Sequence, residues 1–93
     1  MAKLEVSVPR RSVVEAIHGR PSVRIGKGGL HKGLIGEVGR RLKEEGTIKV
    51  RVLRSYLTAS GRTVEDIAGE VAEAVGAEVV MVRGHIFVLR KRR

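Results

Sequence analysis

The residues whose types and spacing could do chemistry form a glycine-rich loop, Gly26-Lys27-Gly28-Gly29, directly after an apolar run that ends at Ile25. Glycine has no Cβ atom, so the backbone can turn sharply there and a ligand can approach its amide groups closely. A helix predicted to begin near Leu30 directs its unpaired N–H groups and its positive dipole end toward the loop. Such a loop suits a phosphate oxygen.

Basic residues surround this loop. Arg24, Lys27 and Lys32 add positive charge, and His31 lies in the first turn of the expected helix. We therefore predict that the amides of residues 27–30 hold one phosphate, with Leu30 as the last of them. A tight strand-to-helix turn that is merely rich in glycine explains the Gly-x-x-Gly spacing equally well. The charge pattern of the whole chain favours binding.

The net charge of +9 is distributed unevenly along the 93 residues. Residues 47–62 carry four Lys/Arg and no acid, residues 63–82 carry five acids and no Lys/Arg, and residues 83–93 carry five Lys/Arg and no acid. A positive face and a negative back follow from this segregation, as in proteins that bind polyanions. A charge run is usually a solvated face, but this pattern makes nucleic acid the favoured partner.

Composition excludes several other classes of protein. The chain has no run of about 18 apolar residues, the length needed to span a membrane. The N-terminus also lacks the apolar stretch of a signal peptide. Without cysteine there is neither a disulfide framework nor a thiolate metal site. We expect a cytoplasmic protein with no membrane partner. The chain also lacks Asn and Gln, which suggests a thermophilic source, with an archaeon as one option.

Catalytic and cofactor motifs are missing. No nucleophile–base pair stands out, and the ten carboxylates fit helix surfaces and caps. The loop is not followed by the Gly-Lys-Ser/Thr of a Walker A motif, and His31 takes the place of the third glycine of the dinucleotide fingerprint. His18, His31 and His85 are too scattered for a metal site. We expect no enzyme, no cofactor and no metal.

The elements that position the loop can be predicted from periodicity, caps and turns. We expect strands at residues 22–25, 47–54, 78–82 and 86–89, helices at residues 12–17, 30–45 and 63–75, a short leading strand or arm at residues 3–8, a connecting loop at residues 55–62 and a basic tail at residues 90–93. The fold class is α/β (α+β in two layers). It has a small four-stranded mixed sheet, about three helices and the order αβαβαββ.

Two features of these elements bear on binding. In the strand 47–54, Lys49 and Arg51 alternate with apolar residues, so one face is cationic. We expect these two residues and the tail to spread along a nucleic-acid backbone; the tail consists of Arg90, Lys91, Arg92 and Arg93. Glycine recurs at Gly33, Gly36 and Gly39 of the expected helix, where each costs about 1 kcal/mol relative to alanine. We interpret these glycines as allowing another backbone to come close to the helix. The alternative interpretation is that they have no such role and only lower the stability of the helix.

Four segments, taken in order, resemble a known family. They are Arg20-Pro21-Ser22-Val23-Arg24-Ile25-Gly26-Lys27-Gly28-Gly29-Leu30, then Gly33-Leu34-Ile35 with Leu42, then Ile48-Lys49-Val50-Arg51-Val52, and last Val82-Arg83-Gly84-His85-Ile86-Phe87-Val88-Leu89. Together they are similar to the CRM (chloroplast RNA splicing and ribosome maturation) domain of YhbY type, over about residues 20–90. The resemblance implies one domain over residues 1–93, similar in fold to the C-terminal domain of translation initiation factor three. Its Gly-x-x-Gly loop falls on residues 26–29.

The resemblance also implies a partner. Members of the family associate with precursors of the large ribosomal subunit, or with introns in plants, and carry no known catalytic chemistry. The implied partner is structured rRNA in a large-subunit precursor, and the implied role is ribosome assembly at a ribosome-associated, cytoplasmic location. Weak self-association stays open. Because Tyr56 and Phe87 are the only aromatic residues, recognition should depend on phosphates, 2′-hydroxyls and shape more than on base stacking.

Two other families share parts of this pattern. KH domains have a similar Ile-Gly-x-x-Gly, but their loop lies between two helices, whereas residues 21–25 here read as a strand. Alba chromatin proteins begin their core with a similar Ile-Gly-Lys strand end. An Alba-like protein that binds duplex DNA as well as RNA is therefore the alternative reading.

Overall fold

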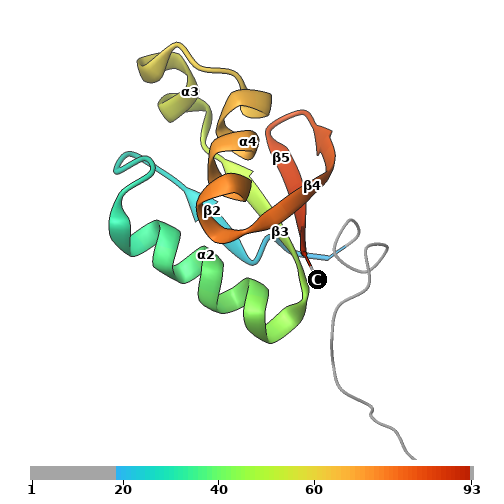
Figure 1. Ribbon diagram of the computed structural model, residues 1–93. Coiled ribbons are helices and arrows are strands. Elements are labelled where there is room, and N and C mark those ends of the chain that lie inside the picture. Colours follow the sequence, from blue (N-terminus) through green and yellow to red (C-terminus); the bar gives the residue numbers. More distant parts are fainter. Residues whose placement is uncertain (1–18, 93) are drawn as a thin grey trace, which may run out of the picture.

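Seven helices and strands make up the part of the chain that the computed structural model describes, residues 19–92 (Figure 1). In chain order they are β2 (Val23–Ile25), α2 (Lys32–Glu45), β3 (Thr47–Val52), α3 (Arg54–Ser60), α4 (Val64–Val75), β4 (Ala77–Arg83) and β5 (Ile86–Lys91). The strand or arm expected at residues 3–8 and the helix expected at residues 12–17 lie outside the described residues.

The four strands form one mixed sheet in the order β2-β3-β5-β4. Strand β2 runs parallel to β3, and the pairs β3–β5 and β5–β4 are antiparallel. The parallel pair needs a long crossover, which α2 supplies, whereas the tight turn at Gly84 and His85 is enough to join β4 to β5. The expected four-stranded mixed sheet of a two-layer fold is confirmed.

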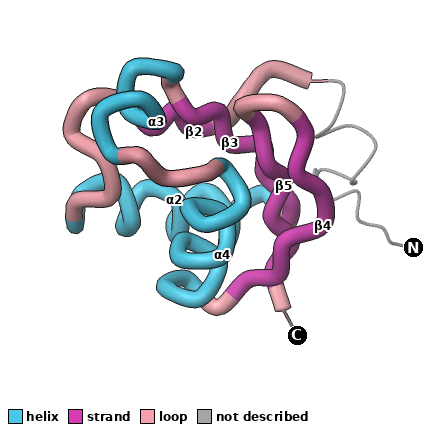
Figure 2. The backbone as a smooth tube through the Cα atoms, turned by 90° about the horizontal axis from the view of Figure 1, so that it is seen from above, coloured by secondary structure: helices cyan, strands magenta, loops and turns pink. Residues whose placement is uncertain are grey.

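Helices α2 and α4 pack on the same face of the sheet and against each other (Figure 2). The apolar residues of β3 alternate toward these helices, and all of its inward side chains are fully buried. The core between the two layers contains, among others, Ile25, Val38, Ile48, Val50, Val52, Ile67, Val71, Phe87 and Leu89. We call the side of the sheet opposite these helices the outer face.

Helix α2 begins two residues later than predicted. Its N-cap is His31, in an extended conformation, and the Nδ1 atom of its imidazole accepts a hydrogen bond from the Leu34 N–H at 3.2 Å. Histidine is an uncommon N-cap, so the sequence signal for this start is weak. The predicted end at Gly46 is confirmed, because its N–H donates to the Leu42 carbonyl oxygen.

Helix α4 has the predicted caps. The Oγ1 atom of Thr63 accepts from the Asp66 N–H at 3.1 Å, and Gly76 ends the helix in the left-handed conformation. Both signals lie in neighbouring residues, which is why the sequence alone could place them.

Residues 54–60 form helix α3, so the prediction of a connecting loop over residues 55–62 was wrong. The helix has seven residues, its N-cap Leu53 makes no side-chain capping bond, and none of its own residues is fully buried. Tyr56 and Leu57 are half-buried against the core. Tertiary packing therefore supports a helix too short to show a periodic apolar stripe.

The predicted tail at residues 90–93 was also partly wrong. Arg90 and Lys91 are the last residues of β5, and the Lys91 N–H donates to the Gly46 carbonyl oxygen at 2.8 Å. Arg92 follows the strand, and Arg93 lies outside the described residues.

No backbone atom of another described element lies close to the glycines in the middle of α2. A Cβ atom added to Gly36 would meet nothing within 4 Å, and one added to Gly39 would meet only Val75 Cγ1 at 3.7 Å. These contacts leave no role for the two glycines in a close approach by the protein's own described backbone.

Candidate nucleic-acid interface

The loop at residues 26–29 is a tight turn between β2 and α2. The Gly29 N–H donates to the Gly26 carbonyl oxygen at 2.9 Å, so this amide is used inside the turn. Lys27 and Gly28, at the tip, are exposed, whereas Gly29 is buried. Of the four amides predicted to hold a phosphate, that of Gly29 is therefore not free to do so.

Two residues, Leu53 and Tyr56, pack against the loop. Neither was predicted for the site. A Cβ atom at Gly29 would lie 2.7 Å from Cε1 of Tyr56, so the Tyr56 ring occupies the space beside that glycine. A Cβ atom at Gly26 would lie 3.2 Å from Cδ1 of Leu53. Both residues lie at the start of α3, and neither could be assigned to the site from the sequence because this helix was not predicted.

His31 lies between the loop and the first turn of α2. Its ring atoms would be 2.9 Å from a Cβ atom at Gly28 and 3.2 Å from one at Gly33. Because the imidazole already caps the Leu34 N–H, the amides of Lys32 and Gly33 are the donors of the first turn that have no partner within the helix. These two donors follow shortly after the loop in the chain.

Arg24 and Arg51 are neighbours in the register of β2 and β3, on the outer face, one residue before each strand ends. Both side chains are exposed, as are those of Lys27 and Lys32. The structure therefore brings four of the predicted cations to the end of the sheet that carries the loop. Lys49 differs, because it is half-buried and its Nζ atom donates to the Gly19 carbonyl oxygen at 2.9 Å.

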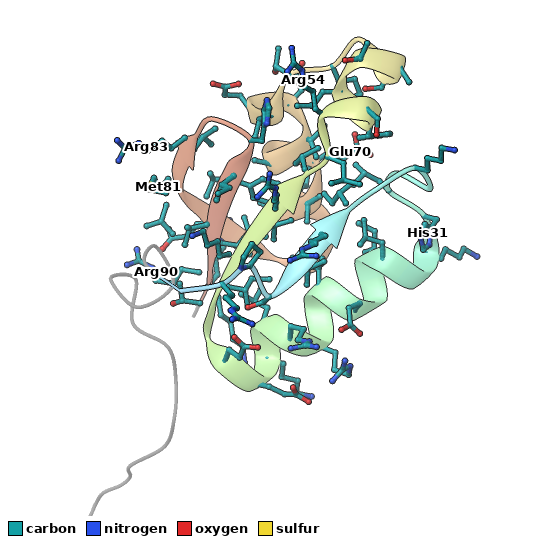
Figure 3. The ribbon with its side chains drawn as sticks, turned by 180° about the vertical axis from the view of Figure 1, so that it is seen from behind. His31, Arg54, Glu70, Met81, Arg83 and Arg90 are labelled. Atoms are coloured by element: carbon teal, nitrogen blue, oxygen red, sulfur yellow. The ribbon has the colours of Figure 1, made fainter. Side chains whose placement is uncertain are left out.

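Two further cations reach this end of the molecule. The Val52 N–H donates to the His85 carbonyl oxygen at 2.8 Å, which places the β4–β5 turn beside the end of β3. Arg83 begins that turn and Arg54 begins α3, and both side chains are exposed (Figure 3). Neither residue was predicted for the site, since only the strand order brings them near the loop.

The cations at the loop end differ from the arginines of α2 in their partners. Within residues 19–92, six cations at the loop end make no ion pair with an acidic side chain. We call them the loop-end cations: Arg24, Lys27, Lys32, Arg51, Arg54 and Arg83. Elsewhere, Arg62 pairs with Glu70, and Arg90 pairs with Glu78 across β4 and β5.

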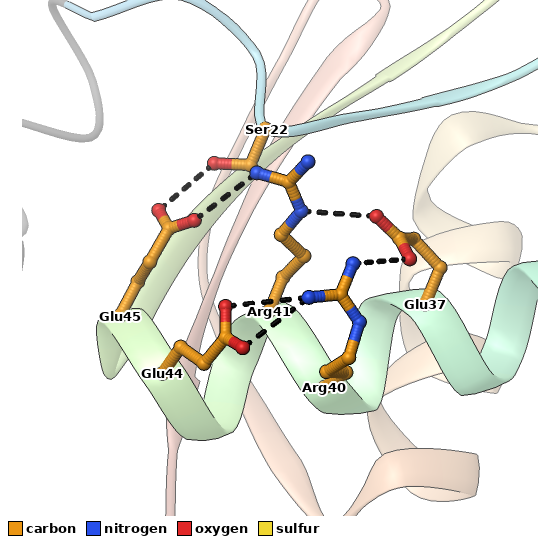
Figure 4. A network of polar contacts seen from close by, with 6 residues as sticks. All are labelled: Ser22, Glu37, Arg40, Arg41, Glu44 and Glu45. Carbon is orange, nitrogen blue, oxygen red and sulfur yellow. Dashed lines mark hydrogen bonds and ion pairs between the residues drawn. The ribbon is translucent and has the colours of Figure 1, made fainter.

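Helix α2 shows the paired group most clearly (Figure 4). Glu37 accepts hydrogen bonds from Arg40 at 2.7 Å and Arg41 at 2.9 Å, and Arg40 and Arg41 also pair with Glu44 and Glu45. Hydrogen bonds from the two guanidinium groups lower the pKa of the Glu37 carboxyl below its ordinary value. The charges on this helix surface are therefore largely neutralised by one another.

The C-terminal cations lie at the other end of the sheet. Arg90 is paired in register with Thr47, the first residue of β3, whereas the loop adjoins the last residues of that strand. Figure 3 shows Arg90 farther than Arg83 from Arg54. The structure thus does not bring Arg90, Lys91 and Arg92 together with the loop.

Within the described residues, no group of three or more His, Cys, Asp or Glu side chains is placed to hold a metal ion. No helix in this part of the chain has the length and apolar character needed to cross a membrane.

Comparison with known proteins agrees with this fold. The model of the CRS1 / YhbY (CRM) domain matches residues 9–91, and the chain belongs to this family. The resemblance predicted over about residues 20–90 is confirmed, and the match begins earlier, at residue 9.

Two relatives carry names that mention RNA. Over 91 residues the chain is 41% identical to a protein of Methanocaldococcus jannaschii named "Probable RNA-binding protein", covering 98% of this chain and 66% of that protein. The chain thus spans slightly less than two thirds of that relative's length. A Staphylococcus aureus protein whose solution structure is described as that of "a putative RNA binding protein" is 27% identical, with a TM-score of 0.68, and the match covers 86% of this chain and 79% of that one.

Proposed function

We propose that this chain binds RNA through the loop at residues 26–29 and the loop-end cations. The observation that carries the proposal is that these six cations have no acidic partner in the described chain, whereas the arginines of α2 do. A carboxylate partner cancels the charge of a guanidinium and occupies some of its N–H groups, so an unpaired cation binds a phosphate more favourably. Family membership and the names of the two relatives support RNA as the polyanion.

In this proposal the N–H groups at the loop tip and in the first turn of α2 hold one phosphate, and Lys27 and Lys32 neutralise it. Arg24 and Arg51 bind neighbouring phosphates. Base stacking contributes little, because Phe87 is fully buried and the Tyr56 ring packs on Gly29. Recognition then depends on the backbone, the 2′-hydroxyls and the shape of a folded RNA, with no catalytic step.

A charge reversal in the loop tests this proposal. Lys27→Asp should lower the affinity for a folded rRNA fragment about tenfold or more, equivalent to about 1.4 kcal/mol, while the melting temperature stays nearly unchanged. Lys43→Asp is the matched control, because Lys43 is also exposed and lies at the other end of α2. Filter binding of both variants gives the comparison. Unchanged RNA binding by Lys27→Asp would mean that the loop is only a turn.

The natural RNA that we propose is structured rRNA in a precursor of the large ribosomal subunit, bound during ribosome assembly in the cytoplasm. In cell extracts the protein should then sediment with large-subunit precursors. Filter binding to folded rRNA, single-stranded RNA and duplex DNA, measured in parallel, separates this function from that of an Alba-like protein. Equal affinity for duplex DNA would favour the Alba-like function.

We also propose a thermophilic source. The chain has no Asn or Gln, and the relative with 41% identity comes from an archaeon. Thermal unfolding followed by circular dichroism tests this directly. A melting temperature of about 45–65 °C, the range of mesophile domains, would contradict it.

A further inference from the structure

Three arginines lie in one row across the sheet. The register places Arg24 beside Arg51, Arg51 opposite Ile86, and Ile86 opposite Arg83. These four residues belong to four different strands, so the row crosses the whole sheet at right angles to the strands. With about 4.8 Å between neighbouring strands, it spans about 14 Å. We call Arg24, Arg51 and Arg83 the arginine row.

The arginine row lies on the outer face. The residues on either side of Arg24 and Arg51 in sequence are buried in the core, and successive side chains of a strand point to opposite sides. Val82, which precedes Arg83, also packs against the core. All three arginines are exposed, and none makes an ion pair within the described chain.

In the other rows of the outer face, the cations already have partners within the protein. The next row contains Lys49, which donates to the Gly19 carbonyl oxygen, with Val88 and Met81. The row at the far end contains Arg90, which pairs with Glu78. On the outer face of the described sheet, the cations without an ion pair or a backbone hydrogen bond therefore lie in the row beside the loop, instead of following the length of β3 as the sequence pattern predicts.

This arrangement is unfavourable without a ligand. Like charges on directly neighbouring strand residues destabilise a sheet, and Arg24 and Arg51 are such neighbours. No acidic residue lies in the row, since the position between Arg51 and Arg83 is taken by the half-buried Ile86. A chain of phosphates laid along the row would remove this repulsion.

We infer that one strand of the bound RNA leaves the loop and crosses the outer face along the arginine row, so that Arg83 is an RNA contact about 14 Å from Arg24. This inference rests on the proposed RNA-binding function. The partner is the sugar–phosphate backbone, because the row contains three cations and no aromatic side chain.

The test compares Arg83→Ala with Lys43→Ala, which removes an exposed cation that is also without an ion pair but lies far from the row. Fluorescence anisotropy with a labelled folded rRNA fragment, repeated at several salt concentrations, gives both the affinity and the salt slope. Arg83→Ala should weaken binding about three- to tenfold and reduce the slope by about 0.7–0.9, the value of one phosphate contact. Lys43→Ala should change neither, and Arg83→Lys should restore the slope.

A salt slope of Arg83→Ala equal to that of the wild type would overturn the path along the row. If Lys27→Asp still weakens binding in that case, the proposed function stands and only the path is wrong. If the wild-type protein does not bind the folded RNA, the proposed function fails, and the inference fails with it.

Discussion

Gly29 is held by two independent constraints at the residue scale. Its φ of +63° is a conformation that residues with a side chain rarely adopt, and the Tyr56 ring lies where a Cβ atom would be. The loop tip can therefore keep its shape only if residue 29 has no side chain. Gly28, by contrast, has no positive φ and is exposed, and an added Cβ atom would meet only the His31 side chain.

We predict that Gly29→Ala lowers the free energy of unfolding by about 1–3 kcal/mol, because alanine is strained at this φ and contacts the Tyr56 ring. Gly28→Ala is the matched control and should lower it by clearly less, since the His31 ring can move. Urea unfolding of both variants provides the measurement. Equal losses would mean that the turn is not held against Tyr56 as the structure shows.

At the scale of the element, α2 combines a surface stabilised by ion pairs with glycines that weaken the helix. Gly36 is exposed, and nothing lies within 4 Å of a Cβ atom added there. Its absent side chain therefore serves no contact with the described chain. What remains is the ordinary cost of glycine in a helix interior.

Gly36→Ala should accordingly stabilise the protein by about 1 kcal/mol, which for a domain of this size raises the melting temperature by about 4–8 °C. Differential scanning calorimetry measures this shift. Gly33→Ala should gain less, because its Cβ atom would lie 3.2 Å from the His31 ring. A Gly36→Ala variant with no gain in stability would show that this position has a constraint absent from the structure.

The stability of the folded state depends on pH through the carboxylate of Glu37, on α2. Since Arg40 and Arg41 lower its pKa below the ordinary value of 4.5, its ionised form stabilises the folded state. This contribution is fully present above pH 4.5 and is lost as the pH falls through the lowered pKa. Glu37→Gln should therefore be less stable than the wild type at neutral pH, and the difference should shrink in acid. Urea unfolding between neutral and strongly acid pH measures it, and a difference independent of pH would contradict this reasoning.

The distribution of charge is the property that matters at the scale of the whole molecule. The outer face carries the arginine row, whereas α4, in the helix layer on the other side of the sheet, exposes Glu65, Asp66, Glu70 and Glu73. Such a molecule is oriented by the field of a polyanion before contact, with its positive face forward.

The salt dependence of RNA affinity should therefore show how many loop-end cations contact phosphates. If all six neutralise a phosphate, the logarithm of the RNA affinity falls with the logarithm of salt concentration with a slope of about −4 to −5. Arg40→Ala should leave this slope unchanged, because Arg40 is already paired with Glu37 and Glu44. Binding titrations over a range of salt concentrations measure the slope, and a nearly flat response would contradict the electrostatic model.

Features that depend only on residues close together in the chain could be predicted from the sequence. The glycine loop, the caps at Thr63, Gly46 and Gly76, and the alternation of β3 depend on local chemistry and on periods of two or 3.6 residues. Helix α3 could not be predicted, because it has seven residues and no capping side chain, and it is stabilised by the packing of Tyr56 and Leu57.

The sequence by itself thus determined the kind of molecule: a basic α+β domain with a mixed sheet and a glycine-rich turn between a strand and a helix. Only the tertiary structure decided which cations are available to a ligand. It paired Arg90 with Glu78, moved the C-terminal cations away from the loop, and aligned Arg83 with Arg24 and Arg51. The reason is physical: strand order and register bring together residues far apart in the chain, and no local pattern records that arrangement.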